Sequence, residues 1–192
     1  MSSVPRILAF AGSARADSIN RKLVHISAEG ARAAGADVTE LDFRDLPMPL
    51  YDGDLEASEG LPANVIAFKE LLMAHQGLLI AAPEYNSSIT PLLKNAIDWA
   101  SRPGPDESPL ACFENKVAAL MSTSPGGLGG LRGLVHVRSI LGNCKVLVLP
   151  DQVAIPRAFS AFDSEGMLSD AKQKDSVEKL GVTLTGILAK LG

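Results

Sequence analysis

Four apolar runs without polar alternation stand out along the chain. They are RILAFAGS, GLLIAAP, KVAALMS and KVLVLP, and each ends in small or turn-forming residues. Strands that are buried on both faces of a sheet have this pattern, because neither face needs polar side chains. A weaker fifth strand is predicted from Asp37 to Asp42, after Gly35, which is well placed to end the first helix.

Segments with helical spacing of apolar residues lie between these strands. The spacing predicts a helix from Leu61 to Ala74 and others on the following sets: Ile19, Leu23 and Ile26; Ile89, Leu93, Ile97 and Ala100; Leu128, Leu131 and Val135; Val177, Leu180, Leu184, Ile187 and Leu191. Strands that alternate with helices call for right-handed crossovers and a parallel sheet covered on both faces. We therefore predict a flavodoxin-like α/β three-layer sandwich with a five-stranded parallel sheet of order 2-1-3-4-5.

The length of 192 residues fits a single domain that spans the whole chain. In the predicted strand order, the ligand crevice opens at the carboxyl ends of strands 1 and 3, where the winding direction reverses. The loops after Ala11 and Ala82 should therefore carry the chemistry. Two long connections, from Phe43 to Gly60 and from Arg102 to Asn115, are also of a length that often serves a function or an interface.

The segment GSARADSIN follows the first strand and places Ser13, Arg15, Ser18 and Asn20 around a turn that opens into a helix near Ser18. Free N–H groups and the positive end of the helix dipole attract anions, and the side chains add neutral donors and one guanidinium, a set that fits a monophosphate. Alternatively, Ser18 only caps the helix and Arg15 is a solvated charge. The position directly after a buried strand favours binding.

Two further loops complete the predicted crevice. After the third strand, Pro83 to Ser88 form an exposed loop, followed by Thr90 and Pro91 as cap and first residue of a helix. Asn86 and backbone N–H groups can face the polar edge of a flat heteroaromatic ring, with Tyr85 at one side, although a plain turn with an exposed aromatic is an equal alternative. After the fourth strand, MSTSPGGLGGLRG has glycines that allow close approach to a ligand, or that simply form a turn.

Composition and charge exclude several classes of protein. Hydrophobic residues make up 46% and charged residues 21%, which is typical of a globular chain, and the net charge of −4 argues against a nucleic-acid partner. No apolar stretch reaches the ~18 residues of a membrane span and the first residues lack the layout of a signal peptide, so we expect a cytoplasmic protein without membrane contact. Cys112 and Cys144 are interpreted as ordinary reduced thiols.

The titratable residues do not form a catalytic or metal-binding set. His25, His75 and His136 are assigned to predicted helices, far apart and without the carboxylate of an H-E-x-x-H motif, so no metal is expected. Glu84 and Asp98 do not make an acid–base pair, because Asp98 belongs to the helix that bears Trp99 and does not face the crevice. Neither G-x-G-x-x-G nor G-x-x-x-x-G-K-[ST] occurs, so a dinucleotide fingerprint and a triphosphate cradle are both excluded.

Taken together, GSARADSIN, PEYNSSITPLLKNAIDWASRP and STSPGGLGG resemble the NADPH-dependent FMN reductase family, which includes quinone, chromate and azo-compound reductases. The resemblance implies that Ser13, Arg15, Ser18, Ile19 and Asn20 hold the FMN phosphate. It also implies that Pro83, Glu84, Tyr85 and Asn86 line the isoalloxazine ring, and that the loop from Ser124 through Gly126 and Gly127 closes the site. It implies a homodimer or homotetramer in which the loop around Pro49 and Tyr51 and the Trp99 helix contribute near the flavin.

The predicted function is therefore an FMN-dependent NAD(P)H oxidoreductase that holds FMN non-covalently. It would pass electrons by alternating hydride transfer to a small acceptor such as a quinone, free flavin, chromate or azo compound. Such chemistry needs no catalytic side chain, because it takes place on the cofactor. The alternatives are a flavodoxin-type electron carrier without NAD(P)H activity of its own, and a small phosphatase with a cysteine nucleophile. The first loop contains no cysteine, and the charge is modest for a carrier.

Overall fold

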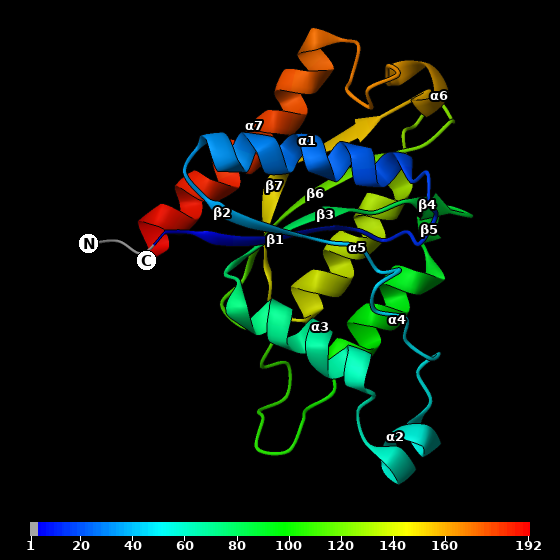
Figure 1. The fold of residues 1–192 in the computed structure, drawn as a ribbon, viewed down its shortest axis with the longest axis vertical. Helices are drawn as coiled ribbons and strands as arrows, with labels where there is room; N and C mark the ends of the chain where they lie inside the picture. Colours follow the sequence, from blue (N-terminus) through cyan, green and yellow to red (C-terminus); the bar gives the residue numbers. More distant parts are fainter. Residues whose placement is uncertain (1–3) are drawn as a thin grey trace.

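The computed structural model describes residues 4–192 and confirms the predicted α/β architecture. Five parallel strands form one sheet in the order β2-β1-β3-β6-β7, which is the predicted 2-1-3-4-5 with a short hairpin left out. Figure 1 shows this sheet between two layers of helices. The strands are β1 (Arg6–Ala11), β2 (Asp37–Leu41), β3 (Gly77–Ala81), β6 (Val117–Thr123) and β7 (Leu147–Ile155).

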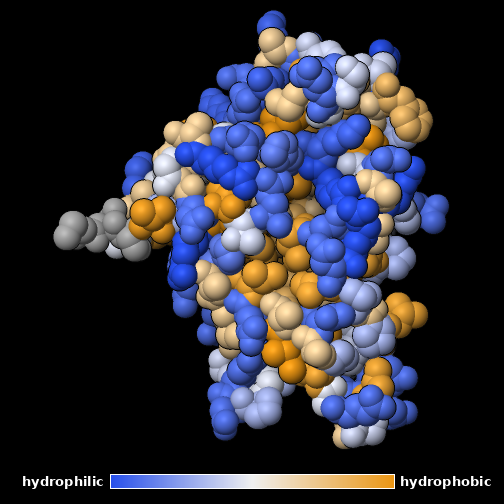
Figure 2. Space-filling view, viewed as in Figure 1, coloured by the Kyte–Doolittle hydropathy of each residue, from blue (hydrophilic) through white to orange (hydrophobic). Residues whose placement is uncertain are grey.

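The two faces of the sheet are covered by different helices, and side chains of β1 alternate between them. Ile7 and Ala9 belong to the core under α1 and α7, whereas Leu8 and Phe10 belong to the core under α3, α4 and α5. The helices are α1 (Ile19–Ala33), α3 (Ala63–Ala74), α4 (Pro91–Ala100), α5 (Leu131–Asn143) and α7 (Ala171–Leu191). In the space-filling view, apolar side chains gather over α3, where Ile66 and Met73 are exposed (Figure 2).

Helix ends follow the local sequence. Thr90 caps α4 by accepting a hydrogen bond from the N–H of Leu93, and Pro91 is the first residue of that helix, as predicted. Gly35 follows the end of α1 with a φ of 93°, the left-handed conformation that glycine adopts without strain. The predicted helix from Leu61 to Ala74 begins two residues later, at Ala63. These ends fix where each connection leaves the sheet.

The prediction for the last strand was wrong in its extent. The strand does not end at Pro150 but runs from Leu147 to Ile155. Pairing with β6 jumps from Ala118–Val148 to Leu120–Gln152, so Pro150, which has no N–H to donate, lies within an irregularity. The strand is also at the edge of the sheet and only partly buried, unlike β1, β3 and β6. Its apolar run resembles theirs, so the sequence pattern did not distinguish this edge strand from the central strands.

The prediction for the apolar face of α5 was also wrong. Leu128 precedes the helix, and Leu131 and Val135 are exposed. The residues that face the core are instead Leu134, Val137 and Leu141. The segment LRGLVHVRSIL has apolar residues on two faces, so spacing alone does not show which face packs against the sheet.

Several short elements were not predicted. The predicted loop from Pro83 to Ser88 instead contains most of a hairpin of β4 (Glu84–Tyr85) and β5 (Ser88–Ile89), so Ile89 belongs to a strand and not to the following helix. The first long connection contains α2 (Gly53–Glu59), and α6 (Ala158–Ala161) follows β7. Within residues 4–192, the structure holds no helix with the length and apolar character that a membrane crossing requires.

Helices α1 and α7 approach each other at two glycines. A Cβ atom added to Gly181 would lie 2.0 Å from the carbonyl oxygen of Ser27, and one added to Gly30 would lie 2.2 Å from the carbonyl oxygen of Glu178. These neighbours are backbone atoms, which cannot move aside without shifting a helix. Only glycine therefore permits the observed crossing.

Replacement of Gly181 by alanine should therefore lower the free energy of unfolding by about 1–3 kcal/mol, the usual cost of overpacking. Gly186→Ala, in the same helix but with no atom within 4 Å of the added Cβ, is the matched control and should raise stability by up to about 1 kcal/mol. Urea denaturation of both variants measures the difference. Equal effects would contradict the close approach.

Candidate functional site

Loops at the carboxyl ends of β1, β3 and β6 converge on one small cleft, as the strand order predicts. Its enclosed volume is about 80 Å³. Nine of the twelve predicted site residues line it, whereas Asn86, Gly126 and Gly127 lie beside it in the same loops. The lining residues are Ser13, Arg15, Ser18, Ile19, Asn20, Pro83, Glu84, Tyr85, Thr123, Ser124 and Pro125.

Thr123 and Pro125 belong to the predicted third loop but were not singled out as site residues, and both line the cleft beside Ser124. A larger hollow of about 590 Å³ lies at the opposite end of the strands, around Lys116 and Leu188. Size alone would favour that hollow. The smaller cleft is the better candidate, because it lies at the switch point of the sheet and combines hydroxyl groups with a helix N-terminus.

The first wall of the cleft is the turn that leads into α1. The side chain of Ser18 accepts a hydrogen bond from the N–H of Arg21 at 3.3 Å and caps the helix. The N–H groups of Ile19 and Asn20, in the first turn, have no acceptor within the helix. Arg15 is exposed and makes no ion pair within residues 4–192, and its N–H donates to the Ser13 hydroxyl at 3.3 Å. Positive charge and free donors thus meet at this wall.

Asn20 connects the first loop to the third. Its side chain is almost fully buried, with the amide nitrogen donating to the carbonyl oxygen of Thr123 at 2.9 Å and the amide oxygen accepting from the N–H of Thr123 at 3.0 Å. The Asn20 amide is therefore engaged within the protein. What this residue offers to a ligand is its backbone N–H.

The second wall is the hairpin of β4 and β5. Asn86 and Ser87 at its tip have φ values of 50° and 68°, as in a type I′ turn, which two non-glycine residues rarely adopt together. Tyr85, immediately before them, is 51% exposed. The turn therefore presents backbone groups and an aromatic ring beside the cleft.

Glu84 directs its carboxylate away from the cleft and toward α5. It accepts hydrogen bonds from the Arg132 guanidinium at 2.9 Å and from the N–H groups of Arg132 and Gly133 at 3.0 and 3.2 Å. Burial opposes ionisation, but these hydrogen bonds and the positive charge of Arg132 lower the pKa of Glu84 below its ordinary value. The carboxylate is thus ionised, and its charge is neutralised locally by Arg132 and the N-terminus of α5.

The glycine loop after β6 forms the third wall, and its four glycines have two different roles. Cβ atoms on Gly129 and Gly130 would lie 2.6 Å from the Ile155 backbone and 2.0 Å from the Ser122 hydroxyl, so these two glycines serve internal packing. A Cβ on Gly127 would meet no atom within 4 Å, and one on Gly126 would meet only the Ser124 hydroxyl, at 3.7 Å. The prediction that the loop's glycines allow approach of a ligand therefore applies at most to Gly126 and Gly127.

The first long connection is fixed to α4 by polar contacts. Buried Trp99 donates its indole N–H to the carbonyl oxygen of Pro49 at 2.8 Å, and Asn95 donates to the same oxygen at 2.8 Å. The ring of Tyr51 packs edge-on against Trp99, with centroids 4.9 Å apart. The Trp99 side chain thus holds the connection and does not reach the cleft.

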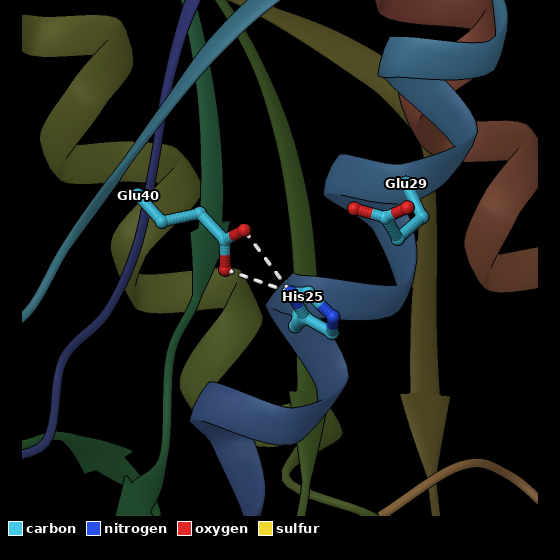
Figure 3. Close-up of side chains that lie close together, drawn as sticks. All are labelled: His25, Glu29 and Glu40. Atoms are coloured by element: carbon cyan, nitrogen blue, oxygen red, sulfur yellow. Dashed lines mark hydrogen bonds and ion pairs between the residues drawn. The ribbon is translucent and has the colours of Figure 1, made fainter.

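The histidines have ordinary structural partners. Figure 3 shows His25 beside Glu40, with Glu29 nearby, a grouping whose ligand atoms lie within 4.8 Å of one another. The Arg32 guanidinium already bonds both carboxylates, at 2.6 Å to Glu29 and 2.8 Å to Glu40, so we interpret the group as an ion-pair network.

The other two histidines also form internal hydrogen bonds. His136 lies in α5, as predicted, and contacts the Ser88 hydroxyl at 2.8 Å. His75, predicted to lie in a helix, instead follows α3 and contacts Thr39 at 2.9 Å. Asp98 forms an exposed ion pair with Lys94 at 2.7 Å, away from the cleft. The acid–base pair rejected from the sequence is therefore not assembled.

The sheet order and the three loops that meet at the carboxyl ends of its strands define a flavodoxin-like α/β protein. The model of the NADPH-dependent FMN reductase family matches residues 5–160, and the chain belongs to this family of enzymes. An NAD(P)H-dependent FMN reductase of Pseudomonas aeruginosa is 37% identical over 93% of this chain and 92% of its own length. An NAD(P)H:quinone oxidoreductase of Solanum tuberosum is 34% identical over 98% and 95%.

A solved structure shows the same relationship. The flavoenzyme NAD(P)H:(acceptor) oxidoreductase FerB from Paracoccus denitrificans superimposes with a TM-score of 0.80 and 27% identity. The match covers 97% of this chain and 98% of that one. The likeness therefore extends over the sheet, both helix layers and the three loops of the cleft.

Proposed function

We propose that this protein is an NAD(P)H-dependent oxidoreductase that binds FMN non-covalently in the three-loop cleft. It passes electrons to a small acceptor such as a quinone, free flavin, chromate or azo compound. The observation that carries this proposal is that the α1 N-terminus, Arg15 and Tyr85 of the hairpin line one cleft, with Arg15 forming no ion pair within residues 4–192. The names of the relatives support the donor and the quinone acceptor.

The cleft fits the phosphate end of FMN. Its volume of about 80 Å³ exceeds the ~30 Å³ of one water molecule but is well below the ~300 Å³ of a pocket that encloses a whole drug-sized ligand. The phosphate therefore occupies the enclosed part, and the ring extends over the rim, where Gly126 and Gly127 are exposed. A ring at the rim is accessible to a second molecule.

The individual roles follow from this placement. Ser13, Ser18 and the N–H groups of Ile19 and Asn20 donate hydrogen bonds to the phosphate, and Arg15 supplies the charge. Residues 83–86 lie along the ring, where Tyr85 limits one side and the Asn86 turn offers backbone groups to its polar edge. Residues 124–127 close the opposite side. Within this stretch, the Glu84 carboxylate is engaged by α5 and anchors the hairpin, so Glu84 lies along the ring through its backbone.

Bound FMN would supply the hydride-accepting and hydride-donating centre, so the chain needs no acid–base pair of its own. The protein binds the cofactor, orients it and leaves one pocket that donor and acceptor occupy in turn.

We expect parallel double-reciprocal lines when the concentrations of NAD(P)H and a quinone are varied together. Intersecting lines would show that both must be bound at once, and failure of NADPH to bleach the bound flavin would identify an electron carrier.

Arg15→Ala should weaken FMN binding by about 10- to 100-fold, which corresponds to 1.5–3 kcal/mol for a charge-assisted hydrogen bond. The fold should persist, because Arg15 is exposed and has no ion pair within residues 4–192. Flavin fluorescence titration of the colourless apoprotein measures the affinity. Lys179→Ala, an equal charge change on the exposed face of α7, is the control. Unchanged affinity in Arg15→Ala would refute the phosphate role.

We further propose that the protein is a homodimer or homotetramer in the cytoplasm. Tyr85, Leu128, Leu131 and Val135 are all more than 40% exposed, and they lie on or beside the hairpin and the first turns of α5. A second copy that covers them would also shelter the open side of the cleft. The two buried, free cysteines are compatible with a reducing compartment.

Val135→Asp should reduce the mass in solution to that of the monomer, because a carboxylate buried at an apolar interface is costly. Val182→Asp, on the exposed face of α7, changes the same residue type and should leave the mass unchanged. Light scattering after size-exclusion chromatography gives the masses. A wild-type protein that is already monomeric would contradict the proposed assembly.

A further inference from the structure

We infer that Arg157, in a polar hollow behind the glycine loop, binds a phosphate group of the nicotinamide donor. The inference rests on the proposed function, since it concerns where NAD(P)H is held. The hollow has a volume of about 330 Å³, and its lining includes Gly127, Arg157, Ser160, Ser169, Asp170 and Gln173. It is separate from the cleft assigned to FMN, with which it shares no lining residue.

The glycine loop joins the two sites. Ser124 and Pro125 line the FMN cleft on one side, and Gly127 lines the second hollow on the other. A Cβ on Gly127 would meet no atom within 4 Å, so the backbone between the sites is uncovered. A donor whose nicotinamide lies over the rim of the cleft can therefore extend across this loop.

The backbone at Arg157 forms hydrogen bonds with the same loop. Its N–H donates to the carbonyl oxygen of Gly126 at 3.2 Å, and the N–H of Ala158 donates to the carbonyl oxygen of Ser124 at 3.1 Å. Arg157 has a φ of 53° and a ψ of 46°, the left-handed conformation that costs a non-glycine residue energy. These contacts maintain it in that conformation, at the edge of the hollow.

The charge of Arg157 is available. Arg21, Arg32, Arg44, Arg102 and Arg132 all form ion pairs with carboxylates. Within residues 4–192, the Arg157 guanidinium forms none, and the same is true of Arg6, Arg15 and Arg138; of these, Arg15 lies at the other side of the loop. Two uncompensated arginines thus flank one loop in a protein whose net charge is −4.

The rest of the hollow is compatible with an anion. The Asp170 carboxylate accepts hydrogen bonds from the N–H groups of Lys172 and Gln173, both at 2.9 Å, and so its charge is directed into the N-terminus of α7. Ser160, Ser169 and Gln173 add neutral donors. A guanidinium with such neighbours suits phosphate, which it can bind through two parallel hydrogen bonds.

The phosphate groups of FMN and NAD(P)H indicate which of the two ligands the second hollow receives. FMN has one, for which Arg15 and the α1 turn are already in place. NAD(P)H has a diphosphate, and NADPH a further 2′-phosphate, yet the chain lacks the G-x-G-x-x-G turn that usually receives them. Side-chain cations can take that role, and Arg157 lies in the hollow on the other side of the glycine loop from the cleft.

The test compares Arg157→Ala with Arg157→Lys and with the charge-matched control Lys179→Ala. We expect Arg157→Ala to raise the KM for NADPH by at least 10-fold, while kcat and the affinity for FMN stay within twofold of wild type. The melting temperature should be unchanged. Arg157→Lys should recover part of the loss. Lys179→Ala should behave as wild type.

Calorimetric titration of the FMN-loaded protein with 2′,5′-ADP and with ADP gives a readout that is independent of turnover. Loss of 2′,5′-ADP binding alone, together with an unchanged KM for NADH, would support contact with the 2′-phosphate. Equal losses for both ligands and both donors would support contact with the diphosphate. An Arg157→Ala protein that keeps wild-type affinity for both, or that loses FMN, would overturn the inference.

These results are distinguishable from failure of the proposed function. If the wild-type protein takes up FMN and oxidises NAD(P)H, an unaffected Arg157→Ala variant removes only the donor-phosphate assignment. If the wild-type protein takes up no FMN, the proposed function fails before any variant is considered, and the donor assignment is overturned with it.

Discussion

A buried pair of hydrogen bonds between Asn20 and Thr123 is the constraint on which the site depends. The two residues are 103 positions apart, and their contact joins the first turn of α1 to the end of β6 at 2.9 and 3.0 Å. Thr123 in turn donates its hydroxyl hydrogen to the carbonyl oxygen of Ile155 at 2.9 Å, which extends the connection to β7. Separation of Asn20 from Thr123 would leave buried polar groups without hydrogen bonds, which is unfavourable. This free-energy cost keeps the first and third loops of the cleft together.

The electrostatics of the cleft follow from how carboxylates near it are compensated. Glu84 is turned into the N-terminus of α5 and paired with Arg132. On the other side, Asp42 is bonded by Arg44 and Arg21, and chiefly through the hydrogen bond from Arg44 its pKa is lowered to about 2. With these charges neutralised where they stand, Arg15 and the α1 N-terminus contribute positive potential at the first wall of the cleft. An acidic protein can thus present an anion-binding site.

The two long connections form a second polar region beside α3 and α4. Lys69, whose side chain is almost fully buried, pairs with Glu107 of the second connection, while Arg102 bonds Glu56 of the first at 2.9 Å. Trp99 and Asn95 hold Pro49 in place from α4. Helix α4, which begins after the hairpin with Thr90 as its cap, therefore anchors the first connection, while Lys69 of α3 anchors the second.

The sequence by itself determined the sheet order, the helix caps at Ser18 and Thr90 and the position of the three loops, because buried strands, caps and switch points depend on local patterns and chain direction. Tertiary structure alone decided that Leu134 and not Leu131 faces the core, that β7 continues through Pro150 at a register shift, and that Gly129 and Gly130 serve packing. It also decided that Asn20 bonds Thr123 and Glu84 bonds Arg132. Each of these depends on which distant atoms arrive beside a residue, and spacing along the chain has no information about them.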